Sequence, residues 1–99
     1  MMQIDARVLA ENTISEIKAL SKRYWDSWTD EEKKLVELSV LDAAQLSLRA
    51  VAGEDISVEK AKVDATLKGI KVAGKGTAKE VVWTYLARAV QAVVSRLLG

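Results

Sequence analysis

The sequence contains no cysteine, histidine, proline or phenylalanine, and only five glycines among its 99 residues. Without cysteine it can form neither a disulfide nor a thiolate metal site. Without histidine as well, the nucleophilic pairs of many hydrolases cannot be built, and the usual general base at neutral pH is missing. We therefore expect no catalytic, cofactor-binding or metal-binding residues, and we predict that the protein is not an enzyme.

The scarcity of helix-breaking residues favours long helices. Charged residues begin at Asp5 and no apolar segment precedes them, so we expect no signal peptide and a cytoplasmic location. Its 15 basic and 14 acidic side chains nearly cancel, for a net charge of +1. This balance argues against a protein whose main work is to coat nucleic acid or an acidic membrane.

Apolar residues recur at helical spacing in four segments, which predicts an all-α chain. Thr29 with Glu32 forms a capping box that opens the second helix, and Thr77 with Glu80 forms another that opens the fourth. Gly53 ends the second helix. We expect a four-helix bundle or a pair of helical hairpins in one domain over residues 1–99, with helices at about 4–25, 30–52, 58–73 and 78–98.

The last predicted helix is apolar around most of its circumference. Its narrow polar strip holds Thr84, Arg88, Gln91 and Ser95. Such a helix has to be surrounded by protein, and a chain this short offers few elements to surround it. Arg88 lies at its centre, which argues against a membrane span. We therefore expect the chain to form a homo-oligomer or to bind another protein.

The third predicted helix carries two opposed apolar faces. One face consists of small residues such as Ala61 and Ala65, and the other holds larger aliphatic side chains. A helix of this kind packs against two neighbours, so it either lies centrally in a monomeric bundle or contacts a second subunit. For the second case we predict an oligomer interface between the third and fourth helices, made of Val63, Leu67, Ile70, Trp83, Val90, Val94 and Leu97.

Lys68, Lys71, Lys75 and Lys79 are spaced three, four and four residues apart. They would form one basic stripe if the helix continued through the glycines beside Lys75, and the sequence leaves open whether the two helices are separate or one kinked rod. Anion or nucleic-acid binding is one interpretation of this stripe. The other is a solvated lysine face, because the stripe has neither the arginines nor the stacking aromatics that nucleic-acid binding usually adds.

Two tryptophans, Trp25 and Trp28, lie in the connection between the first and second helices. Trp28 can pack over the turn, whereas Trp25 lies off the apolar stripe of the first helix. They are either anchors for a protein partner or a plug that closes one end of the bundle. The acidic residues beside them fit helix capping better than a metal site, because they lack the ligand spacing of a calcium loop: Asp26, Asp30, Glu31 and Glu32.

Three features occur together over residues 28–99. They are a tryptophan before an acidic capped helix, a helix ending in Ala52-Gly53-Glu54-Asp55, and a helix over 65–74 that closes in Val-Ala-Gly. This set resembles small helical proteins encoded by tailed phages and prophages. The resemblance implies a virion component, an assembly factor or an inhibitor of a host protein, located in the host cytoplasm or the virion. We expect a self-associating structural or adaptor protein, with anion or nucleic-acid binding and host-protein inhibition as alternatives.

Overall fold

The computed structural model describes residues 5–20, 22–70 and 77–98, except for the side chains of residues 93, 94 and 96–98. The described part is entirely helical outside its turns, which confirms the all-α class. In chain order its helices are α1 (Ala6–Leu20), α2 (Lys22–Ser27), α3 (Asp30–Val51), α4 (Ser57–Lys68) and α5 (Ala78–Leu98). The bounds of α3 and α5 agree with the prediction to within one residue.

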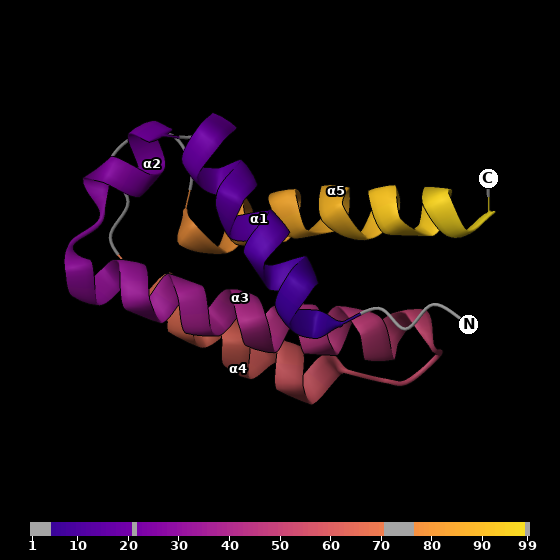
Figure 1. The fold of residues 1–99 in the computed structure, drawn as a ribbon. Helices are drawn as coiled ribbons and strands as arrows, with labels where there is room; N and C mark the ends of the chain where they lie inside the picture. The colour runs from indigo at the N-terminus through magenta and orange to yellow at the C-terminus, as the bar shows by residue number, and fades with distance from the viewer. Residues whose placement is uncertain (1–4, 21, 71–76, 99) are drawn as a thin grey trace.

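Both ends of α3 form as the sequence predicts. At its start, the Thr29 hydroxyl accepts a hydrogen bond from the Glu32 N–H at 3.2 Å, and the Thr29 N–H donates to the Glu32 carboxylate at 3.0 Å. At its end, Gly53 adopts a φ of 94°, which favours glycine. The Glu54 N–H then donates to the Arg49 carbonyl at 3.0 Å, as in a Schellman motif. The chain reverses at this turn, and α4 lies beside α3 (Figure 1).

Asp55 fixes the start of α4, and Gly69 marks its end. The Asp55 carboxylate accepts hydrogen bonds from the hydroxyl of Ser57 and from its N–H, which holds the pKa of Asp55 below the ordinary value of 3.8. The helix stops at Lys68, earlier than the expected end near residue 73. Glycine disfavours helix continuation, and the next residue, Ile70, is buried in the core.

The prediction of one helix over residues 4–25 is wrong, because the chain changes direction between α1 and α2 (Figure 1). Here the Lys18 Nζ lies 4.7 Å from the centroid of the Trp25 ring. Leu20, which continues the apolar stripe of α1 in the sequence, is 64% exposed because α1 ends there.

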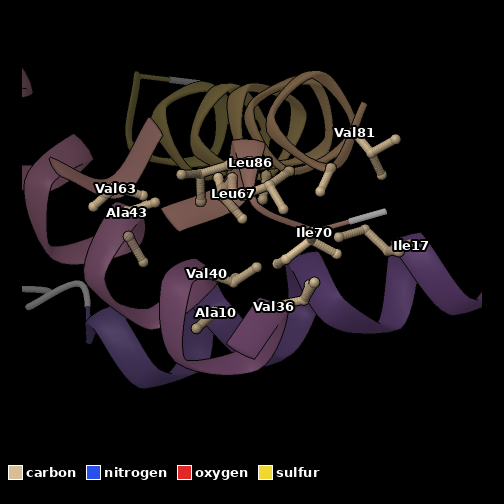
Figure 2. Packing of buried hydrophobic residues seen from close by; sticks show 14 of the residues in the cluster. Ala10, Ile17, Val36, Val40, Ala43, Val63, Leu67, Ile70, Val81 and Leu86 are labelled. Carbon is tan, nitrogen blue, oxygen red and sulfur yellow. The ribbon is translucent and has the colours of Figure 1, made fainter. Parts of the chain in front are cut away.

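A single cluster of buried apolar side chains draws on α1, α3, α4 and α5 (Figure 2). Helix α1 packs against both α3 and α5, and Figure 1 shows it crossing obliquely in front of them, with α5 above the α3–α4 pair. Ile17, Val40, Leu67 and Leu86 are almost completely buried. Burial of each such side chain contributes about 1.5–3 kcal/mol, so this cluster is the main source of stability.

Candidate interaction surface

An open groove of about 160 Å³ lies between α3 and α4. Two leucines on its α3 side remain accessible, Leu35 at 45% and Leu38 at 57% exposure. The buried side chains of Ser39 and Val63 form its floor. The complete lining consists of Leu35, Leu38, Ser39, Asp42, Lys62, Val63 and Thr66. The α3–α4 groove therefore presents apolar side chains to solvent along the outer side of this helix pair.

One acidic and one basic side chain stand on the two walls of the α3–α4 groove. Asp42 lies on α3 and Lys62 on α4, and both are exposed. Within the part of the chain that the structure describes, neither takes part in an ion pair. Further along α3, Arg49 is already paired, with its Nε at 3.3 Å from a Glu54 carboxylate oxygen. Asp42 and Lys62 thus remain available to groups outside the chain.

The Thr66 side chain, which also lines the groove, is satisfied locally. The Thr66 hydroxyl donates to the backbone carbonyl oxygen of Lys62 at 3.2 Å. A threonine hydroxyl bonded to the preceding turn of its own helix offers no donor to a ligand. The groove therefore combines an apolar surface with two opposite charges, which suits contact with another protein better than binding of a small polar molecule.

Sequence reasoning did not single out this groove. Of the residues that line the groove, only Val63 was among the predicted interface residues. The sequence did contain an indication of this groove, because Leu35 and Asp42 are seven residues apart and lie on one side of the helix. An apolar residue and a charge on the same side indicate a boundary between core and solvent. The sequence alone did not show that Leu35 lies on the solvent side of that boundary.

Three of the predicted interface residues are buried in the core of the single chain. Val63, Leu67 and Ile70 are buried in the core cluster formed with α3 and α5 (Figure 2). These side chains are already covered and are not available to a second chain in this conformation. The opposite face of α4 is exposed at Ala61 and Ala65. Helix α4 therefore packs through its larger apolar face only, against α3 and α5, and lies at the edge of the described helices rather than centrally among them.

Trp83 holds α5 against α4 rather than facing solvent. Its Nε1–H donates to the Asp64 Oδ1 at 2.7 Å, and the Lys79 Nζ lies 3.6 Å from the Asp64 Oδ2. The Lys60 Nζ lies 5.3 Å from the centroid of the Trp83 ring. Trp83 and Val90 are half-buried and pack against the core cluster. The side chains of the last two predicted interface residues, Val94 and Leu97, lie outside the described residues.

Only two of the four predicted stripe lysines, Lys68 and Lys79, lie among the described residues. Lys71 and Lys75 lie outside the described residues. Lys68 is exposed near the end of α4, and the charge of Lys79 is opposed by Asp64. Anion or nucleic-acid binding through these lysines stays a prediction, and no described contact adds support to it.

The two tryptophans of the first connection pack against each other. Trp28 is only 3% exposed, and its indole N–H has no hydrogen-bond partner among the described residues. The ring of Trp25 meets it edge to face with the centroids 5.8 Å apart. The Lys18 and Lys33 Nζ atoms lie 4.7 and 5.8 Å from the centroid of the Trp25 ring. This arrangement fits a plug and leaves Trp28 little surface for a partner.

The described residues show neither a metal site nor a membrane-spanning helix. Among the described residues, no group of three or more acidic side chains gathers where a metal ion could be held. Over the same residues, none of the helices has the length and apolar character needed to cross a membrane.

Comparison of the chain with protein-family models, with curated proteins and with solved structures gives no match.

Proposed function

We propose that the protein is a non-enzymatic structural or adaptor module that self-associates. The observation that carries this proposal is the surface of a single chain. It exposes 6534 Å² at a mass of 10.8 kDa, whereas a compact monomer of that mass exposes about 5500 Å². The excess is about 1000 Å², and each partner in an interface of standard size covers about 800 Å².

The shape of the chain explains the excess. Its principal extents are 40 × 29 × 20 Å, so it is elongated rather than spherical. The exposure of Leu38, Ala61 and Ala65 indicates that no described helix covers the outer face of the α3–α4 pair. A second copy that covered this face would remove part of the excess surface from solvent. Self-association is thus the simplest use of this surface.

A module that works through such contacts needs no reactive groups. The resemblance to small helical phage proteins suggests a setting for it, as a virion component or an assembly factor built from repeated copies. The inhibitor alternative draws no support from the tryptophans, because Trp28 is buried and Trp25 is half covered.

Light scattering coupled to size exclusion tests the proposal, run over a protein concentration series at low and high salt. We expect the molar mass to correspond to a dimer or a larger assembly and to fall towards the monomer on dilution. A monomer mass at every concentration would contradict self-association.

A further inference from the structure

We infer that the α3–α4 groove binds the same groove of a second copy, with a two-fold axis that runs along the groove. The inference rests on the proposed self-association and adds its surface and geometry. The groove displays Leu35 and Leu38, which are large apolar side chains accessible to solvent. Two such grooves facing each other would cover the four leucines, and removal of apolar surface from water favours association.

The charges on the groove walls select the direction of the axis. Asp42 and Lys62 line the same groove from opposite sides, one on α3 and the other on α4. An axis along the groove places α3 of each copy over α4 of the other, so that each Asp42 faces the Lys62 of the second copy. An axis across the groove would instead stack α3 on α3 and bring the two Asp42 carboxylates towards each other. Only the first arrangement pairs opposite charges.

Symmetry doubles the effect of each charge. In a two-fold interface every contact occurs twice, so the proposed dimer contains two pairs between Asp42 and Lys62. Such pairs fix the register of an interface and suppress wrong partners, and like charges placed opposite each other are strongly unfavourable. Lys62 and Asp42 need not abandon other partners to form these pairs, since the described chain gives them no ion pair.

A charge exchange at low ionic strength tests the inference, with the dimer dissociation constant measured by sedimentation equilibrium. Asp42→Lys alone turns two attractive pairs into two repulsive ones, and we expect it to weaken the dimer at least about 10-fold. Lys62→Asp alone should also weaken the dimer at least about 10-fold. The double variant with both changes should bring the dissociation constant back to within about 3-fold of the wild type.

Glu37→Lys is the matched control, since it makes the same change of charge on the exposed surface of α3 outside the groove. It should leave the dissociation constant within about 3-fold of the wild type. Circular dichroism checks that every variant keeps its helix content. If the wild type dimerises and the folded single variants dimerise equally well, or the double variant fails to recover, this inference is wrong while the proposed function stands. If the wild type is always a monomer, both are wrong.

Discussion

The hydrogen bond between Trp83 and Asp64 should be the strongest polar contact that holds α5 to α4. It is 2.7 Å long, partly buried, and joins residues 19 positions apart in the chain. A hydrogen bond to a charged group contributes about 1.5–3 kcal/mol. The ion pair of Lys79 with Asp64 adds less than about 1 kcal/mol, since its N–O distance is 3.6 Å and the Lys79 side chain is 36% exposed.

Trp83→Phe removes the donor, and Asp64→Ala removes the acceptor. We expect each single variant to lose about 1.5–3 kcal/mol of unfolding free energy, which corresponds to roughly 4–8 °C in Tm for each kcal/mol. Trp83→Phe also reduces ring packing, so the two changes are combined in a double-mutant cycle. The double variant should lose less than the sum of the single losses, by at least about 1 kcal/mol.

Urea unfolding followed by circular dichroism measures these free energies. One protein concentration is used throughout, because the stability of a self-associating chain depends on it. Asp26→Ala supplies the control cycle with Trp83→Phe, since Asp26 is an exposed carboxylate on α2. The losses of unfolding free energy caused by Asp26→Ala and Trp83→Phe should add in the double variant. A coupling between Trp83 and Asp64 below about 0.3 kcal/mol would refute the reasoning, because sites without a shared contact differ from additivity by that amount.

Three further changes test a helix cap, the core and a titrating carboxylate. Thr29→Ala should cost about 1 kcal/mol and lower Tm by roughly 4–8 °C through loss of the capping box, whereas Thr84→Ala at an exposed site within α5 should not lower it. Leu67→Ala should cost about 2–5 kcal/mol in urea unfolding by leaving a cavity, and Leu20→Ala less than about 0.5 kcal/mol. Because the native pKa of Asp55 is lowered, the unfolded chain binds its proton more readily and the stabilisation is lost as pH falls below 3.8. Asp55→Asn should therefore lower Tm at neutral pH and converge with the wild type in acid, and an equal difference at both pH values would contradict this.

The ends of α3 could be predicted because they are fixed by neighbours in the sequence. The capping box joins Thr29 to Glu32, three residues away, and the turn after α3 needs a glycine at position 53 for its positive φ. Both signals act within one helical turn and hold whatever the rest of the chain does. The same is true of the hydrogen bond from the Glu80 N–H to the Thr77 hydroxyl at 3.2 Å, which marks the start of α5.

The bend between α1 and α2 could not be predicted in this way. The segment over residues 4–25 has no glycine or proline, and its apolar stripe continues through Leu20 to Tyr24. What differs is tertiary: Trp25 packs between Lys18 and the buried Trp28, which belongs to the turn before α3. The Trp25 ring packs edge to face on Trp28 and lies 5.8 Å from the Lys33 Nζ on α3, and the apolar stripe of the first segment gives no signal of these contacts.

The two faces of α4 show how the free energy of burial decides which surface is left for a partner. Val63 and Leu67 on its larger face, and Ile70 just beyond its end, each gain about 1.5–3 kcal/mol on burial. The opposite face at Ala61 and Ala65 offers only methyl groups, whose burial contributes far less free energy per residue. A folded chain therefore turns the larger face inwards, which leaves the smaller face and the adjoining groove for the second copy that we propose. Because that surface is less apolar than a core, its charged walls have more influence on how two copies align.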